Sequence, residues 1–591
     1  MNLSGVLPQL SEDDFEQKFA ERHLIHKVVS KWAKQKPDSL AIISADTGQG
    51  TTWAELEAAT LALATHLLEL GYKKGDCLVT ALPLTTQHII LEYACFRIGM
   101  IFAPLDLRLS LPEMIRSIRQ VQPRGFAFPG VTPLGDFREV GRAVDKECPF
   151  VAHRIQFSAP EETIPGATAA ADLFARASRL ATGTAERRSP EVMENEVMEN
   201  EVNENEVNEN EVSENKVSEN DAALIIFTTG STGSPKPALL SHRNITCQNM
   251  CISQAFFGGD SGMKTLVNLP ASHVGCQTEL LMGTFFGGGT AVILGSFDPA
   301  RSLKAIQDYK VEVVGQIPAM FEFEWRVKTY ETFDLSSLKL AAYGGQQVSE
   351  SFVAKMATMA PWVGTGLGLT ETAGFCTYQL QPRETARQCA VSLGSDMPVY
   401  PASIRGEMRV DGSAGEELPA GEIGHICFRG PQTFLGYIND PAATAKTISK
   451  DGFLYTGDLG YKRADGLHLS GRAKWVIKPS GYQVFPVDVE AHICALTDKV
   501  ASCAVVGVEH AVLSEAIVAF VEKKPGVELP VPVLEKHARA LASYMRPRHY
   551  VLLEAGGIPL NRAAKADYVR LLEMAKREIE ALRAKGKWNR V

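Results

Sequence analysis

Short apolar runs alternate with helix-like segments along much of this chain, and this alternation strongly limits the folds open to it. Segments with helical spacing include 51–76, which ends in glycines, and 243–257, which Ser241 is well placed to cap. Strands alternating with helices predict a parallel α/β sheet, with ligands at the carboxyl ends of the strands. The strand-like runs are CLVTALP (77–83), MIFAPLD (100–106), AALIIF (222–227), KTLVNLP (264–270), TAVILG (290–295), VEVVGQIP (311–318) and LKLAAYGG (338–345).

The pattern changes in the C-terminal third of the chain. From Gly394 to Ser470, short alternating strands with frequent glycine predict a small β subdomain. The tail that follows combines strand-like runs with an amphipathic helix near 564–586, which predicts a compact α+β domain. At 591 residues the chain is too long for one core. The expected fold class is therefore α/β, with a large N-terminal domain (1–473) of α/β subdomains plus a small β subdomain, followed by a small α+β C-terminal domain (474–591).

Residues 191–220 form six copies of a five-residue unit: EVMEN, EVMEN, EVNEN, EVNEN, EVSEN and KVSEN. They contain eleven Glu and one Lys, so the rest of the chain carries a net charge of +1, against −9 for the whole. A period of five matches neither a helix nor a strand, so the valines cannot line one face and build a core. We interpret the repeat as a disordered acidic surface insert in the N-terminal domain, with a partner-binding tail as the alternative.

The sequence shows no targeting or membrane-spanning segment. Its first residues lack the basic start and apolar core of a secretory signal, and no apolar run approaches the ~18 residues of a membrane helix. Eleven scattered cysteines without a paired framework fit a reducing compartment. We therefore expect a cytoplasmic protein without a membrane span. Cys247 and Cys251 have no second ligand pair nearby, so we assign them to core packing rather than to a metal.

The stretch LIIFTTGSTGSPKPALLSH (224–242) runs from an apolar strand into a loop rich in glycine and hydroxyl side chains, with one lysine. Backbone N–H groups, hydroxyls and an ammonium in one loop suit the binding of phosphates. The loop is not a Walker A loop, because Gly233 is followed by Ser-Pro-Lys-Pro rather than by Lys and then Ser or Thr. A flexible surface turn is the alternative, but it does not explain so many hydroxyls directly after a buried strand.

Further motifs follow this loop in order: GLGLTETAG (366–374), YTGDLGY (455–461), GRAKWVIKPSGYQVFPVDVE (471–490) and IPLNRAAKAD (558–567). Together with the loop, the series resembles the adenylate-forming superfamily of acyl-CoA synthetases, peptide-synthetase adenylation domains and firefly-type luciferases. It is most similar in motif to AMP-forming acyl-CoA synthetases, over about residues 24–575 apart from the insert. The resemblance implies that the carboxylate of an acid attacks the α-phosphate of ATP, leaving acyl-AMP and pyrophosphate, and that the acyl group then passes to coenzyme A.

The resemblance also assigns nucleotide-binding roles in the large domain. Thr370 would contact the α-phosphate, and Glu371 would hold a Mg²⁺ that bridges phosphate oxygens. Leu367 stands where the family has an aromatic residue against adenine, and it can still cover one face of the base. Gly344, Gly345 and Gln346 complete this part of the nucleotide-binding set. The residues implied to hold the β- and γ-phosphates are Thr228, Thr229, Gly230, Ser231, Thr232, Gly233 and Lys236.

Other implied contacts to the nucleotide and the acyl group come from later motifs. Asp458 would accept hydrogen bonds from both ribose hydroxyls, and Arg472 would contact the ribose or a phosphate. An ion pair between these two residues is the structural alternative. Lys565 is the implied catalytic lysine, because an ammonium between the acyl carboxylate and the α-phosphate offsets the charge of the transition state. Lys478 and Gln483 would contact nucleotide or acyl groups.

The second step of the implied reaction depends on movement of the C-terminal domain. Lys474 matches the hinge about which this mobile domain swings, withdrawing Lys565 and opening a channel for the thiol. His273 matches a family histidine near the acyl carboxylate, with a neutral core histidine as the alternative. The implied partners are a small-molecule carboxylic acid, ATP and coenzyme A, without nucleic acid; a homodimer is left open.

The acid itself is the least defined part of this interpretation. We expect Gly344, Gly345, Gly364, Gly366 and Gly368 to leave room for it, and no Arg or Lys stands there for a second carboxylate. We therefore expect a fatty, alicyclic or aromatic acid. Pro237 replaces the glycine that usually follows the loop lysine, which removes one N–H group. The alternatives are an acyl-AMP ligase that loads a separate carrier protein, and a non-catalytic nucleotide- or acyl-binding homologue.

Overall fold

The computed structural model describes residues 10–186, 217–228, 235–561 and 565–588. These residues form two compact units. The first contains the described residues up to 228 together with 235–401 and 429–445, and the second contains 402–428 and the described residues from 446 onward. The acidic repeat at 191–220 lies outside the described residues apart from 217–220. The boundary after residue 473 stays a prediction.

Two large sheets with parallel centres form the first unit. In one, β1, β13, β12, β14, β15 and β16 run parallel in that order, and β2, β19 and β20 add antiparallel edges. The strands are β1 (Leu40–Ser44), β2 (Gly50–Thr52), β12 (Lys264–Val267), β13 (Thr290–Ile293), β14 (Val313–Gln316), β15 (Leu340–Tyr343), β16 (Trp362–Thr365), β19 (Thr377–Pro382) and β20 (Ser395–Asp396).

In the other large sheet, β10, β4, β3, β5, β8 and β9 are parallel, and β11 and β23 extend it antiparallel. The strands are β3 (Cys77–Thr80), β4 (Ile101–Pro104), β5 (Gly125–Pro129), β8 (His153–Phe157), β9 (Thr168–Ala169), β10 (Ala222–Thr228), β11 (Lys236–Ser241) and β23 (Gly436–Tyr437). Two short hairpins, β6 (Val131–Thr132) with β7 (Gly135–Asp136) and β17 (Gly368–Leu369) with β18 (Gly374–Phe375), complete the strands of this unit.

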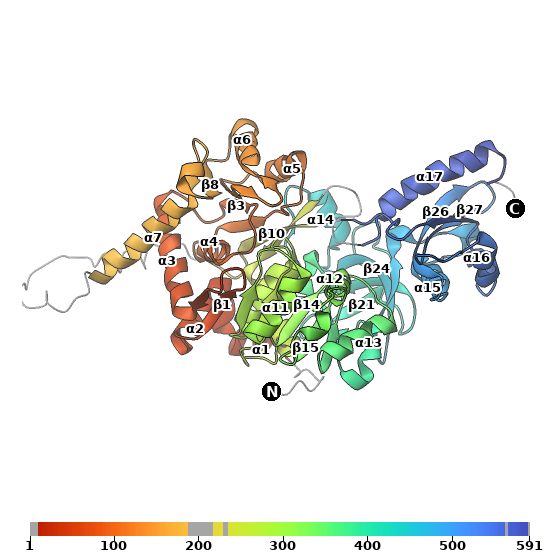
Figure 1. Ribbon diagram of the computed structural model, residues 1–591, viewed down its shortest axis with the longest axis horizontal. Coiled ribbons are helices and arrows are strands. Elements are labelled where there is room, and N and C mark those ends of the chain that lie inside the picture. The colour runs from red at the N-terminus through yellow and green to blue at the C-terminus, as the bar shows by residue number, and fades with distance from the viewer. Residues whose placement is uncertain (1–9, 187–216, 229–234, 562–564, 589–591) are drawn as a thin grey trace, which may run out of the picture. The chain divides into compact units, whose positions relative to one another are not determined.

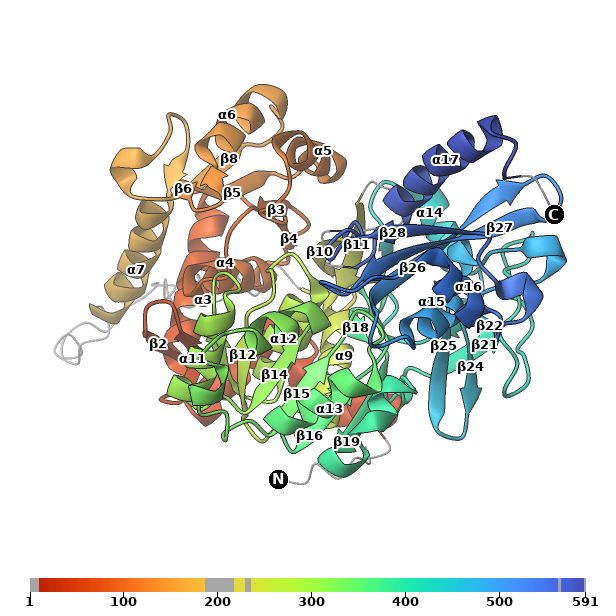
Figure 2. The same ribbon diagram turned by 45° about the vertical axis from the view of Figure 1, so that its right-hand side comes forward.

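Helices cover these sheets, and their ends follow the local sequence. The predicted N-cap is confirmed, because the Ser241 hydroxyl accepts a hydrogen bond from the Asn244 N–H at 3.1 Å. The helices are α1 (Glu12–Lys18), α2 (Ile25–Gln35), α3 (Trp53–Glu69), α4 (Thr86–Arg97), α5 (Leu111–Val121), α6 (Arg138–Glu147), α7 (Ala170–Glu186), α9 (His242–Phe256), α10 (Gly283–Phe286), α11 (Pro299–Tyr309), α12 (Pro318–Trp325), α13 (Glu350–Met359) and α14 (Pro441–Thr447). Figure 1 and Figure 2 both show α11, α12 and α13 in front of β14 and β15.

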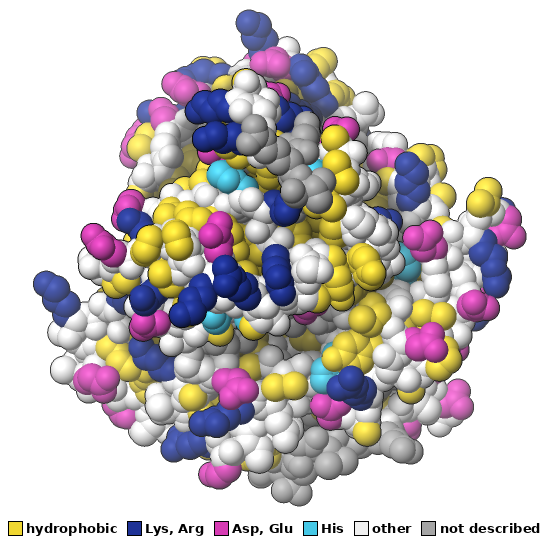
Figure 3. All heavy atoms as spheres, turned by 90° about the vertical axis from the view of Figure 1, so that its right-hand side faces the viewer, with side chains coloured by type: hydrophobic (Ala, Val, Ile, Leu, Met, Phe, Trp, Pro, Cys, Tyr) yellow, Lys and Arg dark blue, Asp and Glu magenta, His cyan; other side chains and the backbone are white. Residues whose placement is uncertain are grey.

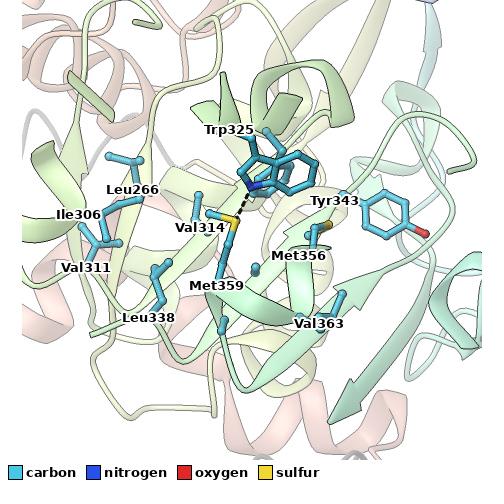
Figure 4. Close-up of a cluster of buried hydrophobic side chains, with 14 of the residues drawn as sticks. Leu266, Ile306, Val311, Val314, Trp325, Leu338, Tyr343, Met356, Met359 and Val363 are labelled. Carbon is cyan, nitrogen blue, oxygen red and sulfur yellow. Dashed lines mark hydrogen bonds between the residues drawn. The ribbon is translucent and has the colours of Figure 1, made fainter. Parts of the chain in front are cut away.

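Burial of apolar side chains between helices and strands holds the sheet in place. Figure 4 shows one such cluster, in which the Trp325 indole N–H points at the Met359 sulfur, 3.2 Å away. The side chains come from the parallel strands β1 and β12 to β16 and from α11, α12 and α13, so the cluster fixes the strand ends that carry the candidate site. Cys247 and Cys251 are both fully buried and not joined by a disulfide, which is consistent with core packing.

The second unit contains two smaller sheets. The predicted β subdomain is the antiparallel sheet of β21 (Ala402–Arg405), β22 (Gly424–Phe428), β24 (Leu454–Arg463) and β25 (Gly466–Arg472). The second sheet contains β26 (Val500–His510), β27 (Ser514–Lys523) and β28 (His549–Leu553). Its helices are α15 (Pro486–Cys494), α16 (Val531–Ala538) and α17 (Tyr568–Ala584). Alternate strand residues enter separate apolar clusters, one with α15 and α16 and one with α17, so helices cover both faces of this sheet.

The predicted fold class is confirmed: parallel α/β sheets in a large N-terminal part, a small antiparallel subdomain and a C-terminal α+β domain. Among the described residues, no helix is both long and apolar enough to cross a membrane. On the face drawn in Figure 3, lysine and arginine side chains are interspersed with acidic and hydrophobic ones.

Candidate active site

The glycine-rich loop connects two paired strands of the first unit. Thr228 ends β10, Lys236 begins β11, and the two residues are register partners. Between them, Thr229, Gly230, Ser231, Thr232 and Gly233 lie outside the described residues. Pro237 follows within β11, where its carbonyl accepts a hydrogen bond from the Ile438 N–H at 3.0 Å. The loop therefore spans the end of a β-hairpin.

Lys236 and Glu371 meet at one tyrosine, Tyr437, which ends β23. The Tyr437 hydroxyl donates a hydrogen bond of 2.6 Å to Oε1 of Glu371, and the Lys236 ammonium lies 5.0 Å from the centre of the same ring. The adjoining Phe434 N–H donates to the Glu371 carbonyl at 3.0 Å. This short segment thus joins the loop lysine to the predicted metal ligand.

Thr370 and Glu371 open the 3₁₀ turn η6 (Thr370–Thr372). The turn closes with Ala373 in the left-handed region at φ 55°, an unusual conformation for a residue with a side chain. Both Thr370 and Glu371 are half-buried. Within the described residues, neither the Thr370 hydroxyl nor Oε2 of Glu371 has a hydrogen-bond partner. These oxygens are therefore available to a ligand.

The predicted adenine-side residues follow β15 and β16. Gly344 donates its N–H to the Gln316 carbonyl at 3.2 Å, Gly345 has φ +94°, and Gln346 is exposed. Leu367 is buried, and its N–H donates to the Thr377 hydroxyl at 2.8 Å. The turn at Gly345 needs a residue that tolerates a positive φ, which is the ordinary use of glycine.

The space beside several glycines is filled by phenylalanine rings of the chain itself. A Cβ on Gly344 or Gly368 would lie 3.1 Å from the Phe375 ring, and one on Gly364 would lie 2.7 Å from Phe256. The expectation that these glycines leave room for the acyl group is therefore wrong at these positions. The sequence does not reveal these contacts, because Phe375 lies in a hairpin that folds back onto Gly344 and Gly368, and Phe256 comes from α9.

His273 lies at the entrance to the π-helix η4 (Gly275–Met282), and its carbonyl accepts a hydrogen bond from the Gln277 N–H at 3.0 Å. The side chain is half-buried and lies near Asp106. Burial acts to raise the pKa of Asp106, but the guanidinium of Arg108, with a smaller contribution from His273, outweighs it and lowers that pKa. His273 thus sits beside a charged pair rather than within an apolar core.

In the second unit, Asp458 and Arg472 are cross-strand partners on β24 and β25. Oδ1 of Asp458 lies 2.8 Å from Nε of Arg472, and Nη1 of Arg472 donates to the Thr456 carbonyl at 3.2 Å. Asp458 is buried, whereas Arg472 is exposed. The ion pair named as the structural alternative is therefore present, and it leaves the Arg472 side chain open to a ligand.

Lys565 lies near this ion pair. Burial and the positive charge of Arg472 lower the pKa of Lys565, while Asp458 acts in the opposite direction. The backbone is held by two hydrogen bonds with Asn561, one from the Asn561 N–H to the Lys565 carbonyl at 2.7 Å and one from the Lys565 N–H to Oδ1 at 3.1 Å. The second unit thus brings together Asp458, Arg472 and Lys565, which are far apart in sequence.

The remaining predicted residues of the second unit are exposed. Lys474 lies in the short turn η8 (Ala473–Trp475), with its ammonium 4.9 Å from the centre of the Trp475 ring. The Lys478 N–H donates to Glu515 at 2.5 Å, and Gln483 follows the turn η9 (Pro479–Gly481).

Comparison with solved structures agrees with this fold. The fold is that of adenylate-forming enzymes: it matches ATP-bound MatB from Rhodopseudomonas palustris with a TM-score of 0.74 and 23% identity, over 93% of this chain and 99% of the other. The amide bond synthetase McbA from Marinactinospora thermotolerans gives a TM-score of 0.73 and 24% identity over 93% and 99%.

The sequence identifies the family. The AMP-binding enzyme model matches residues 29–438 and the AMP-binding enzyme C-terminal domain matches 488–565. The chain therefore belongs to the AMP-binding enzyme family. A feruloyl-CoA synthase from Amycolatopsis is 26% identical over 481 residues, or 80% of this chain and 84% of that protein.

Proposed function

We propose that this protein is an AMP-forming acyl-CoA synthetase. It would activate a fatty, alicyclic or aromatic acid with ATP and pass the acyl group to coenzyme A. The observation that carries the proposal is the Lys236–Tyr437–Glu371 cluster, which holds an ammonium and a carboxylate at the mouth of a glycine-rich hairpin in an AMP-binding enzyme. Such a pair suits a polyphosphate and its cation.

Glu371 fits the role of a Mg²⁺ ligand. Its Oε1 is oriented by the Tyr437 hydroxyl, and its Oε2 has no hydrogen-bond partner among the described residues. A carboxylate oxygen is the donor that Mg²⁺ prefers, and proteins commonly hold this ion through one or two carboxylates together with substrate phosphates. When bound, Mg²⁺ would neutralise charge on the α-phosphate during attack by the acid.

The other residues would bind and orient the reactants. In the first unit, Lys236 and the loop from Thr228 to Gly233 would hold the β- and γ-phosphates, and Thr370 the α-phosphate. Gly344, Gly345, Gln346 and Leu367 would surround the adenine. His273 would position the acyl carboxylate near the start of η4. These groups act before any bond is broken, by aligning one carboxylate oxygen with phosphorus.

In the second unit, Asp458 and Arg472 would contact the ribose, and Lys565 would stabilise the charge that develops when the carboxylate attacks the α-phosphate. The nearness of Lys565 to the Asp458–Arg472 pair supports this assignment. Lys478 and Gln483 would contact nucleotide or acyl groups. Lys474 would be the hinge about which the C-terminal domain turns before thioester formation.

Coenzyme A is proposed as the acceptor because of the relative named feruloyl-CoA synthase. The test is a panel of carboxylic acids assayed for pyrophosphate release, with and without coenzyme A, with thioester identified by mass spectrometry. Acid-dependent pyrophosphate release with thioester formation is expected. Pyrophosphate release without thioester, but with loading of a carrier protein or amine, would identify another acceptor; no release with any acid would refute the proposal.

The two half-reactions can be tested separately with Lys565→Ala. Loss of a charge directed at a transition state commonly costs ~3–4 kcal/mol, so acyl-AMP formation should fall by about 10²- to 10³-fold. Synthetic acyl-AMP plus coenzyme A should still give thioester near the parent rate, because the ammonium is not needed there. Equal loss in both half-reactions would contradict the assignment of Lys565.

A further inference from the structure

A carboxyl group that the sequence motifs did not mark lies on the π-helix η4. Oε1 of Glu279 accepts a hydrogen bond of 2.6 Å from the Phe375 N–H, which belongs to the β17–β18 hairpin. Since η4 begins just after His273 and the hairpin encloses Thr370 and Glu371, Glu279 stands between the two segments to which we assign the acyl carboxylate and the α-phosphate. One of its oxygens is thus fixed by the backbone.

The second oxygen of Glu279 is not used by the hydrogen bond to Phe375. Within the described residues, Oε2 has no hydrogen-bond partner, and the residue is half-buried. The position of Gly275 keeps this oxygen uncovered, because a Cβ there would lie 3.5 Å from Oε2. Burial raises the pKa of Glu279 to about 7, against the opposing effect of the Phe375 N–H, as expected for a carboxyl enclosed by protein yet reached by water.

A second unsatisfied polar group lies beside it. Gln248 of α9 is fully buried, its Oε1 accepts from the Asn249 amide at 3.0 Å, and its Nε2 has no hydrogen-bond partner in the described part of the chain. A Cβ on Gly374 would lie 2.9 Å from this Nε2 and 2.8 Å from Oε1 of Glu279, so both polar groups converge on one glycine with φ +122°. A buried amide without a partner is costly, which marks this corner as polar rather than as hydrophobic core.

A purely structural role explains only half of this arrangement. One oxygen is enough to bind the Phe375 N–H, and a glutamine would do so without the cost of placing a carboxyl among protein atoms. Three features favour a small polar group beside Oε2 of Glu279. Within the described residues this oxygen is free, Gly275 leaves it uncovered, and phenylalanine rings fill the spaces beside the neighbouring glycines. The group that complements the ionised form of Glu279 donates a hydrogen bond, because an ionised carboxylate oxygen only accepts.

We infer that the acyl substrate carries a hydrogen-bond donor, a hydroxyl or an amino group, which Oε2 of Glu279 binds. This inference rests on the proposed function, since it deepens the choice of acid at the same site. It narrows the fatty, alicyclic or aromatic acid expected from the sequence to an acid that has one polar substituent away from its carboxylate. Glu279 is then a specificity-determining residue, Gly275 keeps its Oε2 uncovered, and Gly374 leaves room for its Oε1.

The test uses matched acids that differ only in one substituent. Cinnamate, 4-hydroxycinnamate and 4-aminocinnamate form one set, and octanoate, 8-hydroxyoctanoate and 8-aminooctanoate form another. For each set, kcat/KM is measured by pyrophosphate release in the full chain. In at least one set, kcat/KM for the hydroxyl-substituted or the amino-substituted acid should be tenfold or more above that for the unsubstituted acid. The reason is that a site built to bind a donor is left unsatisfied by an acid without one. The hydroxyl and amino arms identify which donor is used.

Three variants connect this preference to the carboxylate. Glu279→Gln keeps an acceptor for the Phe375 N–H but turns an N–H₂ toward the ligand, so the preference should fall about tenfold or more. Gly275→Ala should reduce it with the carboxylate intact, by partly covering Oε2. The matched control is Glu490→Gln in the second unit, where burial also raises the pKa of Glu490 to about 7 and Oε1 accepts the Val505 N–H at 2.8 Å. This control should leave the preference unchanged.

The outcomes separate this inference from the proposed function. Thioester formation without a donor preference in the parent, or with a preference that survives both Glu279→Gln and Gly275→Ala, overturns the inference and leaves the synthetase proposal intact. If no acid is turned over, calorimetric binding of the same matched acids to the parent and to Glu279→Gln decides the inference alone. Tighter binding of the donor acids, weakened in the variant, supports it; equal binding overturns it.

Discussion

Tyr437→Phe removes one hydroxyl that orients the proposed metal ligand. The hydroxyl donates to Oε1 of Glu371 at 2.6 Å, whereas the ring contacts of Tyr437 with Lys236 and Phe434 need no oxygen and persist in phenylalanine. The variant therefore isolates the orientation of the carboxylate from the position of the lysine. No other side chain among the described residues is recorded as donating to this carboxylate.

The expected size of the effect follows from the bond. A hydrogen bond to a charged group contributes ~1.5–3 kcal/mol, and we take about 1–2 kcal/mol because both partners are only half-buried. This free energy corresponds to a factor of about 5–30, close to the ~10–100-fold effect of losing a residue that orients a metal ligand. The concentration of Mg²⁺ for half-maximal acyl-AMP formation should rise by that factor.

The assay is pyrophosphate release at saturating acid and ATP across a Mg²⁺ titration, for the parent and Tyr437→Phe. The control is Tyr400→Phe, which loses a buried hydroxyl bonded to the Thr433 hydroxyl at 2.8 Å. It should lower the melting temperature without moving the Mg²⁺ dependence. An unchanged or smaller Mg²⁺ requirement in Tyr437→Phe would refute the view that the hydroxyl prepares Glu371 for the metal.

Three other predictions concern charge, packing and the insert. Burial and Arg472 lower the pKa of Lys565, so its ammonium is lost at a lower pH than that of an ordinary lysine, and adenylation should decline at that pH. Arg472→Gln should shift this alkaline decline to higher pH in normalised pH–rate profiles. An unchanged profile would contradict the assignment of Lys565. Gly366→Ala places a Cβ 2.1 Å from the Thr377 carbonyl oxygen and should destabilise the first unit by about 1–3 kcal/mol, which lowers the melting temperature by several degrees. In the control Gly406→Ala, the nearest atom to the new Cβ is 3.9 Å away, so the melting temperature should not change. Deleting 191–220 should leave melting temperature and turnover nearly unchanged, and a large loss of either would show that the repeat has a role in the fold.

The fold could be predicted from the sequence because its determinants are local. Apolar runs such as 77–83 and 222–227 became β3 and β10, with the ends shortened or shifted by a few residues. Ser241 begins α9 through a bond to a residue three positions later. The glycine-rich change in pattern after residue 394 marked the antiparallel sheet of the second unit. Periodicity and capping act over a few residues, so a single sequence contains them in readable form.

The unpredicted parts of the candidate site all depend on long-range contacts. Tyr437 reaches Glu371 across 66 positions, and Glu279 reaches Phe375 across 96. The residues next to them in the sequence do not predict contacts over such separations, and a single tyrosine or glutamate forms no motif. The same cause explains the wrong expectation for Gly344 and Gly368, since an absent Cβ shows where space is needed but not which group will fill it. Motifs therefore located the groups that we assign to ATP, because the chemistry of the family requires those groups. The choice of acid depends instead on contacts that only folding creates. Variants of Glu279 are where that choice can be measured.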